Sequence, residues 1–135
     1  MTFDYFYGDQ AGLFSFYRIP KLLFTDPRFR NLSAESKTLY GILLDRMSLS
    51  ARNGWRDEEG RVYIIFTVEE IQESLSCGNK KAISLLDELE NKANLIERKR
   101  QGLGKPNLIY VKNFCSVEFP VERHFLKCQN DTSGS

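Results

Sequence analysis

The hydrophobic positions of residues 67–112 follow a helical spacing twice and then change to the spacing of extended strands. The first helical stretch opens with Thr67-Val68-Glu69-Glu70, which has the order of a capping box. In that motif the threonine side chain accepts a hydrogen bond from the amide of Glu70, and the Glu70 carboxylate accepts one from the amide of Thr67. Apolar residues then recur at i, i+3 and i+7 from Val68. The pattern predicts a short helix that begins at Val68 and ends at the Ser76-Cys77-Gly78 turn.

A second amphipathic helix is predicted from Asn79. Its apolar residues fall at i, i+3, i+4 and i+7 and are Ala82, Leu85, Leu86 and Leu89. Two short helices joined by a glycine-containing turn are typical of a helix-turn-helix, whose second helix enters a groove of DNA. The side chains expected to face outward near the start of this helix are Asn79, Lys80, Lys81, Ile83 and Ser84. They suit contacts with base edges, thymine methyl groups and phosphates, although a solvated face on an ordinary packed helix has the same composition.

The following segment predicts a β-hairpin. Leu95–Gln101 has the composition of a strand, Gly102–Asn107 is a glycine-rich turn, and Leu108–Val111 is the returning strand. No acidic residue lies between positions 98 and 112, and the five basic residues there are Arg98, Lys99, Arg100, Lys105 and Lys112. In a chain whose formal net charge is only +1, this separation of charge indicates a surface for phosphates. The alternative is that basic residues on an edge strand only discourage aggregation.

Upstream positions predict a supporting helix and one more strand. Ser33 can cap a helix whose first turn contains Glu35. The apolar stripe of that helix consists of Leu39, Tyr40, Leu43, Leu44 and Met47. Arg61–Phe66 is a β-branched and aromatic run that can pair with the hairpin. The resulting order of helix, strand, helix, helix, strand, wing and strand is that of a winged helix-turn-helix. We therefore predict an α+β fold, with the hairpin as the wing, over residues 25–114.

The first 24 residues form a separate region that is rich in aromatic side chains. It holds eight of the chain's 17 aromatic residues, namely Phe3, Tyr5, Phe6, Tyr7, Phe14, Phe16, Tyr17 and Phe24. Exposed apolar surface of this extent usually marks an interface. We expect this arm either to fold back as a β-strand on its own domain or to bury itself on a second copy in a homodimer. Residues 20–24 are predicted to form a short helix, and residues 115–135 a linker or tail that is largely disordered at its end.

Composition excludes several classes of protein. The 135 residues, of which 41% are hydrophobic, suit one globular domain, and no apolar run is long enough to cross a membrane. The first residues lack the pattern of a signal peptide, so we expect a cytoplasmic protein. The chain has no Walker loop, no nucleophile motif and no C-x-x-C pair for zinc. We accordingly predict no enzymatic activity, no cofactor and no metal site.

Several stretches of the sequence resemble the N-terminal domain of plasmid replication initiator A proteins from Gram-positive bacteria. They are Phe14–Phe24, Leu32–Lys37, Leu39–Met47, Gly54-Trp55, Val62–Phe66, the helix-turn-helix, Lys105–Asn107 and Val111–Phe114, and together they extend over about residues 3–114. The resemblance implies a winged helix that binds repeated sites at a replication origin, usually as a dimer. It also implies a further C-terminal domain that engages host replication proteins, and we expect that domain to lie outside this sequence.

The predicted function is therefore sequence-specific binding of double-stranded DNA at a plasmid or mobile-element replication origin, as the N-terminal domain of an initiator. Asn79, Lys80, Lys81, Ile83 and Ser84 are expected in the major groove, with Arg98, Lys99, Arg100 and Lys105 at the wing. Two alternatives stay open. One is a winged-helix transcriptional regulator, and the other is a protein-interaction winged helix that does not bind DNA.

Overall fold

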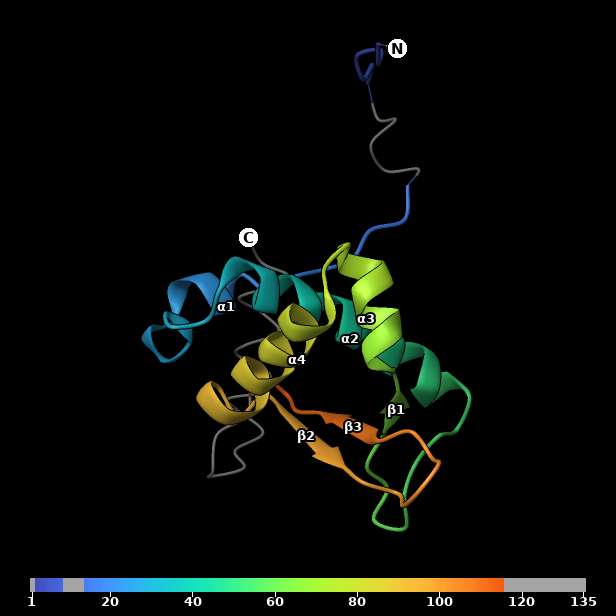
Figure 1. Cartoon of the computed structure of the whole chain (residues 1–135). Helices are drawn as coiled ribbons and strands as arrows, with labels where there is room; N and C mark the ends of the chain where they lie inside the picture. The colour runs from blue at the N-terminus through green and yellow to red at the C-terminus, as the bar shows by residue number, and fades with distance from the viewer. Residues whose placement is uncertain (1, 9–13, 116–135) are drawn as a thin grey trace.

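A computed structural model describes residues 2–8 and 14–115 of the chain (Figure 1). Its elements, in order, are α1 (Leu22–Thr25), the 3₁₀ turn η2 (Pro27–Phe29), α2 (Ala34–Arg52), β1 (Ile64–Ile65), α3 (Val68–Leu75), α4 (Asn79–Asp87), the π-helical turn η3 (Glu88–Lys92), β2 (Ile96–Lys99) and β3 (Leu108–Val111). From α2 onward, this is the order of a winged helix. The predicted fold class is confirmed.

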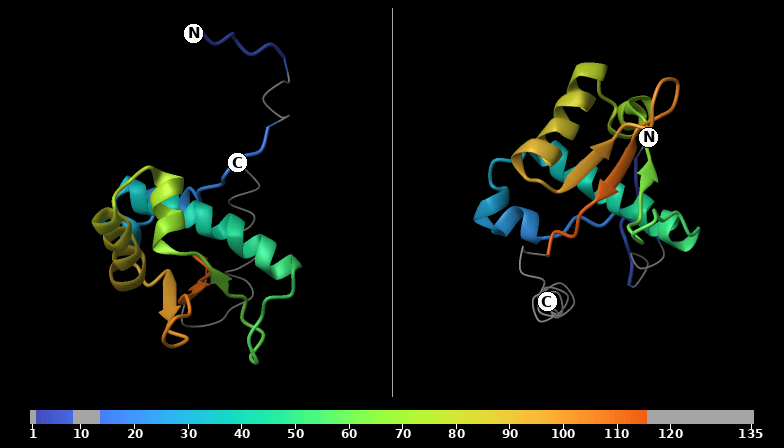
Figure 2. Two further views of the ribbon diagram at one scale, coloured as in Figure 1. Left: turned by 45° about the vertical axis from the view of Figure 1, so that its right-hand side comes forward. Right: turned by 90° about the horizontal axis from the view of Figure 1, so that it is seen from below.

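The strands form a small antiparallel sheet in the order β1-β3-β2. Central strand β3 pairs through Ile109 with Ile64 of β1 and with Arg98 of β2. The hairpin of β2 and β3 is the predicted wing, and we use that name for residues 96–111. The helices lie on one side of the sheet, as the two views in Figure 2 show.

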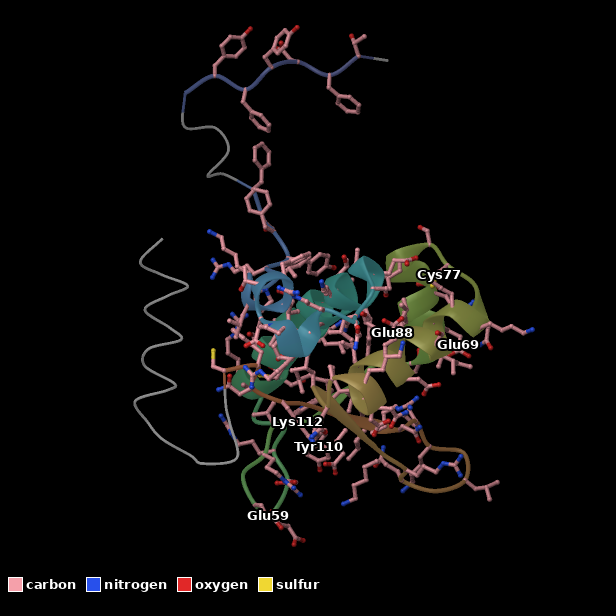
Figure 3. All side chains as sticks on the ribbon, turned by 90° about the vertical axis from the view of Figure 1, so that its left-hand side faces the viewer. Glu59, Glu69, Cys77, Glu88, Tyr110 and Lys112 are labelled. Carbon is pink, nitrogen blue, oxygen red and sulfur yellow. The ribbon has the colours of Figure 1, made fainter. Side chains whose placement is uncertain are left out.

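Strand β1 is shorter than the predicted run from Arg61 to Phe66. The beginning of that run pairs locally instead, because Val62 forms a bridge with Arg56 and the amide of Tyr63 donates to the carbonyl of Trp55 at 3.2 Å. Residues 57–60, an acidic loop between Arg56 and Val62, form a closed turn. In this turn Asp57 Oδ1 accepts from the amides of Glu59 and Arg61, both at 2.9 Å. Figure 3 shows Glu59 at the outer end of this turn.

Helix α2 is the centre of the core. Leu39, Tyr40 and Leu43 from its predicted stripe are completely buried, while Leu44 and Met47 are partly buried against the same cluster. The Tyr40 hydroxyl donates to the carbonyl of Lys112, just beyond β3. Burial raises the pKa of Tyr40 above its ordinary value, so the hydroxyl keeps its proton for this bond. The contact fixes the end of the wing to the helical layer.

The predicted helix caps are present. Ser33 Oγ accepts from the amide of Ser36 at 3.1 Å and caps α2. At the start of α3, Thr67 Oγ1 accepts from the amide of Glu70 at 3.1 Å, and Glu70 Oε1 accepts from the amide of Thr67 at 3.2 Å. Both halves of the capping box therefore form, as expected. Helix α3 ends at Leu75, and its C-cap Ser76, whose φ is 52°, turns the chain toward α4.

The N-terminal arm differs from the expectation. Residues 2–8 and 14–19 form no strand, and Phe3 and Tyr5 are 91% and 82% exposed. The prediction that the arm folds back as a β-strand is thus wrong for the described residues. The root of the arm instead crosses α2 at Gly41, where an added Cβ would lie 2.9 Å from the carbonyl oxygen of Arg18. This crossing is on the helical layer rather than at a sheet edge, so the root meets no strand to extend.

The flanking predictions have separate outcomes. The short helix expected at residues 20–24 is α1, shifted to Leu22–Thr25. The predicted tail lies outside the described residues from position 116 onward. Among the helices that the structure describes, none combines the length and the apolar character that a membrane span requires.

Candidate nucleic-acid interface

Helix α4 buries one face and exposes the other. Ala82, Leu85 and Leu86 are buried in the core, together with Leu89 from η3. Because an α-helix repeats every 3.6 residues, burial of this stripe leaves the opposite side in solvent. The five residues predicted to face outward are all exposed, namely Asn79, Lys80, Lys81, Ile83 and Ser84. The structure therefore brings them together on one surface, as the pattern indicated.

The two lysines on this surface have different surroundings. Lys81 Nζ lies 3.1 Å from Glu35 Oε1 at the start of α2. Both side chains are largely exposed, so the pair contributes little to stability and holds Lys81 only loosely. Lys80 has no ion pair with any residue that the structure describes. Of the two, Lys80 is the cation fully available for a ligand.

The far end of α4 is fixed to α2 through Glu88. Its carboxylate accepts from the amide of Ser33 at 2.9 Å and from the Ser33 hydroxyl at 3.1 Å. Figure 3 shows Glu88 beside the helices that it joins. Burial alone would raise the pKa of Glu88, but the hydrogen bonds from Ser33 and Ser36 outweigh it and hold the pKa below the usual value. A charged Glu88 therefore orients α4 on its support.

Arg98 lies in β2 of the wing, as predicted, but its side chain forms ion pairs that the sequence pattern did not indicate. Its Nε donates to Glu90 Oε1 at 2.7 Å, one terminal nitrogen donates to Asp87 Oδ1 at 2.6 Å, and its amide donates to Glu90 Oε2 at 3.0 Å. The guanidinium is thus paired with two carboxylates of the chain itself, which makes Arg98 less available to a phosphate than the unpaired wing cations, and its DNA contact stays a prediction. These pairs join the base of the wing to the end of α4. The two acids at positions 87 and 90 are visible in the sequence, but their helical spacing alone does not pair them with Arg98.

The remaining wing cations are exposed. Lys99 alternates with Arg98 along β2 and so projects from the other face of the strand. Arg100 and Lys105 flank the turn and have no ion pair within the described ranges. Lys112, which also belonged to the basic run, donates from Nζ to Asn94 Oδ1 at 2.7 Å. The free positive charge of the wing is therefore concentrated at Lys99, Arg100 and Lys105.

Helix α4 and the turn of the wing lie on the same side of the molecule when it is seen from below (Figure 2, right). This arrangement presents an exposed helix and a basic hairpin to one ligand. No group of three or more histidine, cysteine or acidic side chains is placed to hold a metal ion in residues 2–8 and 14–115.

A family model described as the N-terminus of replication initiator protein A (RepA) matches residues 15–123. This match includes the helix-turn-helix and the wing. The chain belongs to this family. A curated relative, described as a 41 kDa protein from Lactobacillus helveticus, is 28% identical to this chain over 92 residues. That alignment covers 68% of this chain and 26% of the relative, so the chain spans about a quarter of the relative's length.

Three solved structures are similar to this chain along nearly its whole length. One is described as the N-terminal domain of a DNA binding protein, with 34% identity, a TM-score of 0.70, and coverage of 99% of this chain and 98% of the other. A structure of a Rep-DNA complex has 34% identity, a TM-score of 0.69 and 98% coverage of both chains. A structure described as an MDR initiator has 35% identity, a TM-score of 0.66, and coverage of 94% and 99%. The family resemblance inferred from the sequence is confirmed.

Proposed function

We propose that this chain is the origin-binding domain of a replication initiator and binds repeated sites in double-stranded DNA at a plasmid or mobile-element origin. The observation that carries the proposal is that α4, whose outward residues are exposed, and the basic turn of the wing lie on the same side of the molecule. A winged helix places its second helix in the major groove and can reach the adjoining backbone or minor groove with its wing. The relative described as a Rep-DNA complex supports the same ligand. Binding rather than catalysis is the proposed chemistry.

In this proposal Asn79, Lys80, Ile83 and Ser84 contact base edges, and Lys81 reaches DNA once it leaves Glu35. Lys99, Arg100 and Lys105 contact phosphates. Asparagine offers a donor and an acceptor to adenine, lysine donates to guanine, and isoleucine packs against a thymine methyl. Both positively charged groups and base-reading groups are thus supplied by one surface.

The direct test compares Asn79→Ala and Lys80→Ala with the parent chain on a cognate duplex and on a scrambled duplex. The cognate site can be selected from a random DNA pool with the parent protein. Loss of a base contact should weaken cognate binding by about 1–3 kcal/mol and leave scrambled binding less changed. Arg52→Ala, which removes an exposed cation at the end of α2, is the matched control and should bind as the parent does. Equal losses on both duplexes would contradict base reading by α4.

Two further results separate the alternatives. Protection of iterated sites in the adjoining origin supports an initiator, whereas protection confined to a promoter supports a transcriptional regulator. A protein-interaction module would show no salt-dependent DNA affinity at all, because it releases no counterions from DNA.

We also propose that two copies pair through the aromatic arm when they occupy neighbouring sites. The exposed rings of Phe3, Tyr5 and Phe16 lack cover within the described chain, and the root of the arm is held against α2 at Gly41. Paired domains bind repeated sites more tightly than single ones because the second contact is intramolecular. Deleting residues 1–14 should shift the sedimenting mass toward a monomer without unfolding the helices. An intact chain that sediments as a monomer at micromolar concentration would contradict this pairing.

The remaining partners follow from the family resemblance. We propose that host replication proteins are engaged by a further domain of the longer initiator, and that the protein acts in the cytoplasm, where plasmid DNA lies. Capture of a host replication protein by this domain alone would contradict the assignment of that contact to another part of the initiator.

A further inference from the structure

The tip of the wing carries a fully exposed leucine, Leu103. It lies between Gly102 and Gly104, whose φ angles are 124° and 79°. An added Cβ at either glycine would meet nothing within 4 Å, so no part of the described domain surrounds this tip. Single exposed apolar residues are ordinary on protein surfaces. The position of Leu103, rather than its exposure, is therefore the informative feature.

The neck of the turn is closed, which presents Leu103 outward. The amide of Lys105 donates to the carbonyl of Gly102 at 3.3 Å, and the side-chain amide of Gln101 donates to the carbonyl of Pro106 at 2.8 Å. On either side of this tip lie Arg100 and Lys105, two of the wing cations that have no ion pair within the described ranges. The turn thus offers one apolar side chain between two cations, on the same side of the molecule as α4.

The minor groove of A·T-rich DNA is complementary to such a tip. It is narrow and has an enhanced negative potential, which attracts cations toward its two phosphate walls. Its floor shows only acceptor atoms at A·T pairs, whereas a G·C pair adds the N2 amino group of guanine. A leucine packed over that amino group removes it from water and offers no acceptor in return, which is unfavourable. An apolar tip can therefore distinguish A·T from G·C pairs. The neighbouring cations contact only phosphates and cannot make this distinction.

We propose that Leu103 enters the minor groove beside the α4 site and makes the wing select A·T pairs there. The inference rests on the proposed DNA-binding function and adds a specificity determinant to it. In this proposal Leu103 contacts the floor of the groove and does not insert between base pairs. Unstacking two base pairs costs free energy, and Gly102 and Gly104, which have no atoms packed behind them, give Leu103 no rigid support for it.

The test uses three duplexes that carry the selected cognate site and differ only at the base pairs beneath the wing, which are A·T, G·C or inosine·C. Inosine lacks the guanine amino group, so an inosine·C pair resembles A·T in the minor groove and G·C in the major groove. The intact chain should bind the A·T and inosine·C duplexes equally and the G·C duplex roughly tenfold more weakly. Leu103→Ser should bind all three alike, whereas Leu103→Met should keep the preference.

Three comparisons identify the contact. Leu49→Ala removes another exposed leucine, at the end of α2, and should leave the preference unchanged. Leu103→Ser should also keep the parent's thermal stability and the parent's dependence of affinity on salt, because this side chain contacts neither the core nor a phosphate. Lys105→Ala should instead flatten the salt dependence.

Three results would overturn the inference while the proposed function stands: equal binding of A·T and G·C duplexes by the intact chain, an unchanged preference in Leu103→Ser, or inosine·C binding as weak as G·C. The last would place the discrimination in the major groove. Absence of salt-dependent binding to every duplex would instead overturn the proposed function and this inference with it.

Discussion

Arg98→Met should destabilise the domain, because it leaves Glu90 and Asp87 without their shared cation. The contact to Glu90 joins side chains that are 25% and 24% exposed, so it is worth about 1.5–2 kcal/mol as a hydrogen bond between charged groups. Asp87 is 52% exposed, and its contact adds only a few tenths of a kcal/mol, as for a surface pair. The expected loss is therefore about 2 kcal/mol. For a domain of this size that corresponds to a fall in Tm of roughly 10 °C.

The pH dependence of the same change follows from Glu90. Burial alone would raise the pKa of Glu90, but the hydrogen bonds from the Arg98 amide and guanidinium outweigh it and leave the pKa lowered. A carboxyl whose pKa is lowered by folding stabilises the native state above its ordinary pKa of about 4.3 and loses that contribution as pH falls through the folded value. The difference in stability between parent and Arg98→Met should be largest near pH 7 and should shrink below about pH 4.

The assay is urea unfolding of Arg98→Met, Glu90→Gln and the double variant, monitored by the circular dichroism signal of the helices. Residues in contact should give a coupling energy of about 1 kcal/mol. Arg28→Met is the matched control, because it breaks an ion pair with Asp26 within one exposed turn and should cost less than about 0.5 kcal/mol. Additive effects of the Arg98 and Glu90 changes would refute the reasoning. So would a flatter salt dependence of DNA binding in Arg98→Met, because that result would place Arg98 among the phosphate contacts.

Four other substitutions examine three separate parts of the domain. Arg100→Ala or Lys105→Ala should reduce the slope of log affinity against log salt by roughly one for each lost phosphate contact, and an unchanged slope would make the wing charge a solubility feature. Gly41→Ala should lower thermal stability by about 1–3 kcal/mol, because its Cβ would press on the backbone of Arg18 at 2.9 Å; a stability equal to the parent's would show that the arm root is not held there. Thr67→Ala should cost about 1 kcal/mol in urea unfolding through loss of the α3 cap, and a cost near zero would argue that the capping box contributes nothing.

The helix-turn-helix could be predicted because its signals are local. Thr67 and Glu70 are close enough in sequence to cap one another wherever the helix packs, and both bonds form. The stripe at Ala82, Leu85 and Leu86 likewise specifies which side of α4 is buried, whatever element covers it. The outward residues of α4 followed from this stripe alone.

The role of Arg98 could not be predicted in the same way. Its partners precede it by 8 and 11 residues, and the intervening turn is π-helical, with the Ala93 amide donating to the Glu88 carbonyl at 3.1 Å. Helical periodicity does not predict that turn, which places Glu90 beside Arg98 of β2. The prediction of a β-strand in the N-terminal arm was wrong for a related reason. A count of aromatic residues shows that they need cover, but not which surface supplies it.

Four of the five outward side chains of α4 make no polar contact that stabilises the described domain. Within residues 14–115, Asn79, Lys80, Ile83 and Ser84 make no side-chain hydrogen bond or ion pair, while the helix is held in place by Glu88 and by its buried stripe. Exchanging these four residues therefore leaves the scaffold intact. Under the proposed function, related replicons could diverge in the DNA sequence that each recognises through substitutions on one helix, without compensating changes elsewhere in the domain.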